Sequence, residues 1–215
     1  MEIYEDAIAA FRSGATGRAE DLALELLSEA RDAGDANSQV DGLCMLARVA
    51  LRRGDLERVS ILAGEARGLA RRAGQHRLER MPIHMQAVAV RMRADYSSAR
   101  LLYEESIELN VQLGEQRMVA AEHRNLAYVE LNDGHADRAR QLFARASGLA
   151  RACGYDALEP YLLLDAAVMA LEDGDKEAAA QLAAAMRAAL AEAAQLLDPD
   201  DEAEEDRLRT RLSEL

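Results

Sequence analysis

Glycine recurs at a fixed spacing along this chain of 215 residues. The first series repeats every 40 positions, carries an alanine at its third position, and comprises Gly14, Gly54, Ala94, Gly134 and Gly174. The second series has the same period and comprises Gly34, Gly74, Gly114 and Gly154. Two interleaved series at one period indicate a repeated unit with two turns, which is typical of a solenoid built from stacked units.

Small side chains follow the same period. One set contains alanine alone and comprises Ala7, Ala47, Ala87, Ala127 and Ala167. A second set contains one valine and comprises Ala19, Val59, Ala99, Ala139 and Ala179. Small residues at fixed points allow two helices to approach closely. We therefore expect each unit to be a pair of closely packed helices.

Residues 115–154 show the pattern within one unit. Apolar side chains recur with helical spacing over 115–132 and again over 136–153, and Gly134 and Gly154 follow these two stretches. Glycine readily adopts the left-handed conformation that ends a helix, so these glycines predict the helix ends. Pro82 and Pro160 stand near the start of a first helix, where proline is tolerated in the first turn but kinks a helix that begins earlier.

The repeat resembles the tetratricopeptide repeat (TPR). The positions that carry the resemblance are Leu126, Ala127, Gly134, Ala139, Phe143 and Ala146 of the fourth unit, and residues 95–106 of the third. His123 replaces the usual aromatic residue of the first helix, Arg151 replaces the closing proline, and the period is 40 rather than about 34. Long-period arrays of this kind are similar to the sensor regions of bacterial regulators and peptide-pheromone receptors, which implies peptide or protein binding.

The expected fold is therefore all-α, a right-handed α-solenoid of about five TPR-like hairpins followed by a C-terminal capping helix. The expected units are residues 1–34, 35–74, 75–114, 115–154 and 155–197. Residues 198–215 form the expected amphipathic cap, in which Leu208, Leu212 and Leu215 make an apolar stripe and Asp198-Pro199 opens the helix. The acidic run over 198–206 is interpreted as a solvated helix start.

Charge and composition limit the classes of function that are compatible with this chain. The net charge is −13, which argues against direct nucleic-acid binding, and no apolar stretch of about 18 residues predicts a membrane span. The two cysteines, Cys44 and Cys153, are expected to be free thiols, and the acidic N-terminus lacks the shape of a signal peptide. These features predict a cytoplasmic location. No motif for catalysis, for a cofactor or for a metal is found, so we expect a protein that is not an enzyme.

In TPR arrays the first helix of each unit lines the concave groove, and the 40-residue register transfers those positions to this chain. The resulting ligand-binding candidates are Tyr4, Arg12, Arg48, Arg52, His84, Arg91, Arg124, Tyr128, Asn132 and Tyr161. The groove contains five arginines and only two acids, Asp41 and Glu172. Arg48 and Arg52 lie one turn apart, so both can reach one carboxylate. The predicted partner is an acidic protein or peptide segment.

Three alternatives stay open. The groove arginines can instead pair with acids on neighbouring helices. The chain can be a homodimer or a homo-oligomeric scaffold, because no cap precedes the first unit and the C-terminal segment is amphipathic. It can also be a small-molecule binder or an enzyme, in which Cys44 and His84, at equivalent positions 40 apart, would form a nucleophile and its base.

Overall fold

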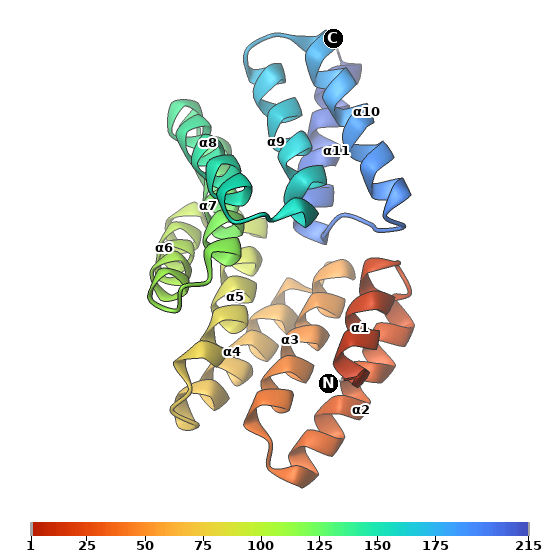
Figure 1. Ribbon diagram of the computed structural model, residues 1–215, viewed down its shortest axis with the longest axis vertical. Coiled ribbons are helices and arrows are strands. Elements are labelled where there is room, and N and C mark those ends of the chain that lie inside the picture. Colours follow the sequence, from red (N-terminus) through yellow and green to blue (C-terminus); the bar gives the residue numbers. More distant parts are fainter. Residues whose placement is uncertain (1, 215) are drawn as a thin grey trace. The chain divides into compact units, whose positions relative to one another are not determined.

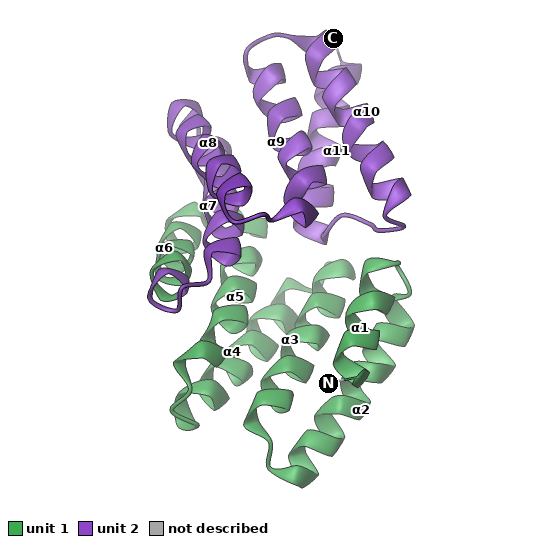
Figure 2. Cartoon of the chain, in the orientation of Figure 1, with its two compact units in different colours: residues 1–109 green, residues 110–215 purple. Residues whose placement is uncertain are grey.

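The computed structural model describes residues 2–214, which form eleven α-helices and two 3-10 turns and contain no β-strand. The chain divides into two compact units, residues 1–109 and residues 110–215 (Figure 2). Within each unit, helices that follow one another along the chain pack against one another (Figure 1). The expected all-α class is confirmed for the described residues.

Unit 1 contains five complete helices and one 3-10 turn: α1 (Glu2–Arg12), α2 (Thr16–Ala33), α3 (Ala36–Arg52), α4 (Leu56–Arg72), η1 (His76–Glu79) and α5 (Arg80–Met92). Helix α6 (Tyr96–Gln112) contains the division between the units. Besides the contacts between successive helices, α3 contacts both α1 and α5. The first helices of the repeats in unit 1 therefore lie next to one another.

Unit 2 contains five complete helices and one 3-10 turn: α7 (Gln116–Asn132), α8 (Ala136–Ala152), η2 (Asp156–Leu158), α9 (Glu159–Glu172), α10 (Lys176–Glu192) and α11 (Pro199–Ser213). Helix α11 lies beside α9 and α10 (Figure 1). Its apolar anchor is Leu208, which joins the core formed by α9 and α10, while Leu212 packs against that core and is only partly buried. Leu215 of the expected stripe lies outside the described residues.

The glycine series mark the helix ends, as predicted. In each of these turns the glycine N–H donates to the carbonyl three residues earlier, and the next N–H donates to the carbonyl five residues before it; at Gly34 these bonds are 3.2 and 2.9 Å. The paired bonds define a Schellman motif, which requires a left-handed residue. Gly134 has φ 85°. Ala94 of the first series has φ 60°, and Ala194, which lies 40 residues after Gly154 in place of a glycine, has φ 51°.

Aspartate follows the turn residue at several helix starts. Its carboxylate accepts a backbone N–H of the new helix and satisfies a donor that lacks an intrahelical partner. The aspartates that cap in this way are Asp35, Asp55, Asp95 and Asp175. A left-handed turn residue followed by aspartate, with glycine at three of these turns and Ala94 at the fourth, thus both ends one helix and starts the next.

The small-residue series form the contacts between helices. All ten positions of the two series are 0% exposed. Gly42 shows how close the approach is, because a Cβ at this position of α3 would lie 3.2 Å from the Cβ of Leu27 on α2. The prediction of close helix packing at these positions is confirmed.

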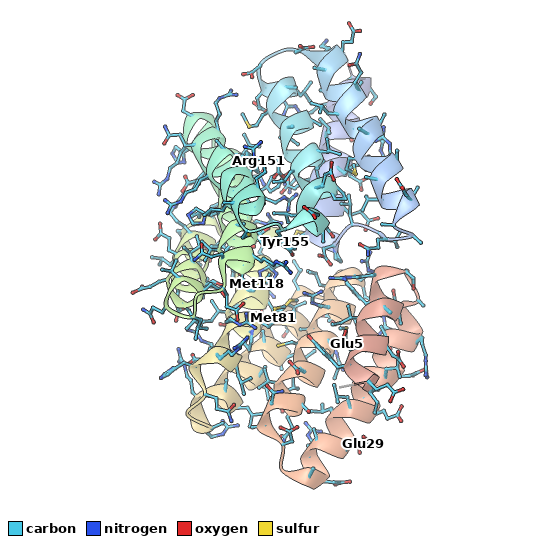
Figure 3. The ribbon with its side chains drawn as sticks, in the orientation of Figure 1. Glu5, Glu29, Met81, Met118, Arg151 and Tyr155 are labelled. Atoms are coloured by element: carbon cyan, nitrogen blue, oxygen red, sulfur yellow. The ribbon has the colours of Figure 1, made fainter. Side chains whose placement is uncertain are left out.

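Both interior prolines lie in the first turn of a shortened helix. Pro82 is the third residue of α5 and Pro160 the second of α9, and each helix follows a 3-10 turn. No kink is needed, because the 3-10 turn takes the place of the extra α-helical turn. In unit 2 this turn is preceded by Tyr155, labelled in Figure 3, whose ring centroid lies 5.7 Å from the guanidinium carbon of Arg117.

Surface ion pairs repeat with the same register. Arg53 pairs with Glu20 at 2.5 Å in unit 1, and Arg140 pairs with Asp173 at 2.7 Å in unit 2. The two pairs occupy positions 120 residues apart, which is three periods, but the basic and acidic partners are exchanged. The repeat therefore preserves the position of the contact rather than the identity of the charges.

Candidate functional site

The predicted ligand-binding residues of unit 1 come from α1, α3 and α5. Arg48 and Arg52 both lie over the ring of Phe11, with their guanidinium carbons 5.9 and 4.5 Å from its centroid. Phe11 itself is 1% exposed. The one-turn spacing of the two arginines thus directs both of them to the same aromatic ring, where cation–π attraction holds them.

Burial perturbs the titratable groups near these arginines. Burial raises the pKa of Tyr4 to about 12, and the positive charge of Arg48 opposes that rise. Burial and the negative charge of Asp35 raise the pKa of Asp41 to about 6. The face formed by α1 and α3 therefore combines cationic side chains with a carboxyl group that resists ionisation.

The remaining ligand-binding candidates of unit 1 do not gather around one side chain as Arg48 and Arg52 do around Phe11. Arg12 is exposed at the end of α1, and Arg91 is buried on α5. His84 is half-buried, with its ring edge-on to Tyr103 at a centroid distance of 6.4 Å. Burial raises the pKa of the Cys44 thiol to about 12, so this thiol stays protonated, and a protonated thiol is a weak nucleophile.

The candidates of unit 2 form a connected cluster around Arg124. Its Nε lies 2.9 Å from Asp165 of α9, and its Nη1 donates to Asp201 of α11 at 2.6 Å. The guanidinium carbon also lies 5.0 Å from the ring centroid of Tyr128 and 5.1 Å from that of Tyr161. Arg124 and both aspartates are less than 5% exposed. A buried arginine of this kind needs these partners to offset its loss of hydration.

The tyrosine hydroxyl completes the cluster. Burial raises the pKa of Tyr128 well above its ordinary value, and the negative charge of Asp165 adds to this rise. The protonated hydroxyl donates to Asp165 at 2.8 Å. Burial lowers the pKa of Arg124, but Asp165 and Asp201 more than compensate, so its pKa lies well above the usual value. Asp165 of α9 thus binds both Arg124 and Tyr128 of α7 and joins the two helices.

A second polar contact joins α7 to α11. Asn132 Nδ2 donates to Glu204 at 3.0 Å, and Glu204 also accepts from Arg207 at 2.8 Å. At the far end of α11, Arg211 pairs with Glu172 of α9. Helix α11 therefore lies on a surface that we call the α7–α9 face, defined by Arg124, Tyr128, Asn132, Tyr161 and Asp165.

Two cavities flank α11. The larger, of about 570 Å³, is lined by α7, α9 and α11 and includes Leu131, Val168 and Leu208. The smaller, of about 260 Å³, lies between α10 and α11. Helix α11 thus covers the α7–α9 face without filling the space on either side of itself.

The structure corrects the interpretation of the acidic run over 198–206 as a solvated helix start. Asp200, Asp201 and Glu204 are 5%, 4% and 5% exposed. Asp198 occupies the N-cap position, but its side chain makes no capping hydrogen bond. The spacing of Leu197, Asp201, Glu204 and Leu208, by four, three and four residues, is the sequence signal that marks this buried stripe.

Arg124, Tyr128, Asn132 and Tyr161 were predicted from the sequence, and the structure brings Arg124, Tyr128 and Tyr161 together. Asp165, Asp201 and Glu204, which supply the negative charge, were not predicted. With two carboxylates around one guanidinium, the centre of the α7–α9 face carries no positive excess while α11 is in place. For Arg124, the open alternative of pairing with acids on neighbouring helices is the one observed.

No family model matches this chain, and no curated protein matches it significantly. Within residues 2–214 there is no membrane-spanning helix, because none of the helices there has both the required length and the required apolar content. In that part of the chain, histidine, cysteine and acidic side chains form no group of three that could hold a metal ion.

Proposed function

We propose that this chain is a cytoplasmic, non-catalytic protein-binding module whose ligand is an acidic amphipathic peptide or helix. In this proposal the hairpins are TPR-like units of a right-handed α-solenoid, and the first helix of each unit contacts the ligand. The observation that carries the proposal is α11 itself. An acidic helix rests on the first helices of unit 2, and its carboxylates accept hydrogen bonds from Arg124 and Asn132.

The residue types on these faces suit such a ligand. Arginine supplies directional donors for carboxylates, and aromatic side chains supply apolar contact area at a low cost in conformational entropy. Unit 1 presents Arg48 and Arg52 around Phe11, and unit 2 presents Arg124 between Tyr128 and Tyr161. Stacked helices hold these groups in place before the ligand arrives, which reduces the entropy lost on binding.

The test uses a fluorescent synthetic peptide with the sequence of residues 198–215, titrated into the full-length chain and followed by anisotropy. We expect Arg48→Ala/Arg52→Ala to bind this peptide at least about tenfold more weakly than the unmodified chain, as expected when charge-assisted hydrogen bonds are lost. Arg18→Ala/Arg58→Ala removes the same charge from exposed positions of α2 and α4 and should leave the affinity unchanged. Equal binding by both variants would reject the proposed role of Arg48 and Arg52.

A homo-oligomeric scaffold is the second candidate. Ile61 of α4 and Leu101 of α6 occupy equivalent positions 40 residues apart and are 62% and 69% exposed. Apolar side chains repeated on one face favour contact with another apolar surface. Sedimentation of the full-length chain at high concentration distinguishes this candidate, since a strict monomer excludes it and a dimer abolished by Ile61→Ser/Leu101→Ser supports it.

A further inference from the structure

We infer that α11 is an intramolecular occupant of the α7–α9 face, and that an acidic amphipathic partner helix with the pattern Asp-x-x-Glu-x-x-x-Leu binds this face by displacing it. The pattern is that of Asp201, Glu204 and Leu208. The inference rests on the proposed function and adds the identity of the ligand's contact groups and the way in which access to the face is controlled.

The contact between α11 and the α7–α9 face is largely polar. The buried residues of α11 are Asp200, Asp201, Glu204 and Leu208, of which one is apolar. By contrast, the buried residues of the neighbouring α10 are Ala179, Ala183, Met186 and Leu190, all of them apolar. A helix that serves only to cover an apolar end would be expected to bury an apolar stripe. The contacts of α11 are instead made largely by groups that water or another carboxylate ligand can replace.

The contacts that organise the α7–α9 face are formed mainly between α7 and α9 themselves, so the face should keep its organisation when α11 leaves. Asp165 of α9 lies 2.9 Å from Arg124 Nε and accepts from the Tyr128 hydroxyl at 2.8 Å, and neither of these contacts involves α11. The donors released are Nη1 of Arg124 and Nδ2 of Asn132, which bind Asp201 and Glu204 in the closed arrangement. Two carboxylates one helical turn apart on a partner helix can meet these two donors.

A cavity lies beside α11. The cavity of about 570 Å³ is bordered on one side by Leu131, Asn132 and Val168 and on the other by Glu204 and Leu208. A partner helix can therefore contact part of the α7–α9 face before α11 has left it. Residues 193–198 connect α10 to α11 without helical structure, so α11 can move without unwinding α10.

Two double variants of the C-terminal segment, matched in charge, test this inference. Asp201→Asn/Glu204→Gln removes the two buried carboxylates that bind α7. Asp206→Asn/Glu214→Gln removes the same charge from exposed positions of the C-terminal segment. Both pairs are made in the full-length chain, with and without Arg48→Ala/Arg52→Ala, so that binding to unit 1 is measured separately.

The probe is the fluorescent peptide of residues 198–215. We expect Asp201→Asn/Glu204→Gln to bind it at least about tenfold more tightly than the unmodified chain, because a tethered occupant competes at a high effective concentration. The exposed-charge pair should show no gain. A peptide with Asn and Gln at the positions of Asp201 and Glu204 should lose the gain, since it cannot accept from Arg124 and Asn132 as a carboxylate does.

A second measurement needs no variant. Saturating a uniformly 15N-labelled chain with the unlabelled peptide should raise the rate of amide hydrogen exchange at Arg207 and Leu208 of the chain several-fold, because a displaced α11 protects its backbone N–H groups less well. The inference is overturned if this rate is unchanged by bound peptide, or if the affinity is the same with and without the buried carboxylates. In either case, weaker binding by Arg48→Ala/Arg52→Ala would leave the proposed function in place. Absence of peptide binding to every form rejects both.

Discussion

Arg124 of α7 donates to Asp201 of α11 at 2.6 Å, although the two residues are 77 positions apart in the chain. Both are almost fully buried. The contact joins the first helix of one hairpin to the C-terminal helix and lies at the centre of the α7–α9 face. It is also the contact that our inference requires a ligand to replace.

Replacing Arg124 by leucine should destabilise unit 2 by about 3–5 kcal/mol, because Asp165 and Asp201 would remain as buried carboxylates without a cation. Urea unfolding followed by circular dichroism measures the loss. Adding Asp165→Asn and Asp201→Asn to the leucine variant should recover most of it. A loss below about 1 kcal/mol for Arg124→Leu alone would contradict the importance of this charge cluster.

Ala94→Gly should stabilise the chain by about 0.5 kcal/mol, because Ala94 is held at φ 60°, where a Cβ is unfavourable. Ala73→Gly is the control, since Ala73 stands one position before Gly74, a turn glycine of the second series, and has φ −76°. We expect this control to be neutral or slightly destabilising. Thermal unfolding compares the two, and an equal response from both would reject the role of the left-handed conformation.

Gly42→Ala and Gly64→Ala should have opposite effects. A Cβ on Gly42 would lie 3.2 Å from Leu27 Cβ and 3.3 Å from the Ala23 carbonyl oxygen, so α2 and α3 would have to separate, at a cost of about 1–3 kcal/mol. A Cβ on Gly64 of α4 meets nothing within 4 Å. Because alanine has a higher helix propensity than glycine, Gly64→Ala should stabilise the folded chain by about 0.5–1 kcal/mol. Denaturant midpoints of the two variants provide the comparison. Stabilisation by both would show that α2 and α3 can adjust.

His123 should make the chain lose stability in mild acid. His123 is 4% exposed and its Nδ1 lies 2.8 Å from the Val119 carbonyl oxygen. Burial lowers the pKa of His123, although the contact with Val119 opposes this. The unfolded chain therefore binds a proton at a higher pH than the folded chain does. Stability should fall as the pH decreases through about 6.5 towards the lower folded pKa.

The variant His123→Asn checks this prediction, since it removes the titration. Its unfolding free energy should fall less steeply between pH 7 and pH 5 than that of the unmodified chain. A slope that is unchanged by the substitution would show that His123 does not cause the acid sensitivity.

Asp41 should make the chain lose stability as the pH rises, which is the opposite of the effect of His123. Its pKa is raised to about 6, chiefly by burial and then by Asp35, so the folded chain holds this proton more tightly than the unfolded chain does. Stability from this group is present at low pH and is lost as the pH rises from about 4 through about 6. Asp41→Asn should therefore stabilise at pH 7.5 by on the order of 1–2 kcal/mol, reduced by partial exposure, and should give no gain near pH 4. Asp32→Asn, at an exposed position of α2, is the control, and an equal gain from it would contradict the prediction.

Much of the fold could be predicted because its signals are local. A turn residue every 20 positions, as in Gly34 and Gly54, specifies where each helix ends through bonds that span only a few residues. The small residues of the two series specify which faces meet, and all are buried. The 3-10 turns before Pro82 and Pro160 were not predicted, because either a first-turn proline or a kink was compatible with the sequence.

The candidate site was predicted only in part. The repeat register identified Arg124, Tyr128 and Tyr161, because equivalent positions of stacked helices share a face. It could not identify Asp201 or Glu204, because α11 has no counterpart in the repeat. The acidic run also favours a solvated helix by composition, and only the spacing of its members indicates a buried side.

By itself, therefore, the sequence determined the helical hairpins, their turns and their close contacts, since each depends on residues near one another or on positions that recur with the period. The tertiary structure alone decided where α11 lies and which charges meet beneath it. A buried carboxylate is stable only where donors such as Arg124 Nη1 and Asn132 Nδ2 replace its lost hydration. Those donors are brought to Asp201 and Glu204 by the folded arrangement of α7, α9 and α11, and by nothing within the C-terminal segment.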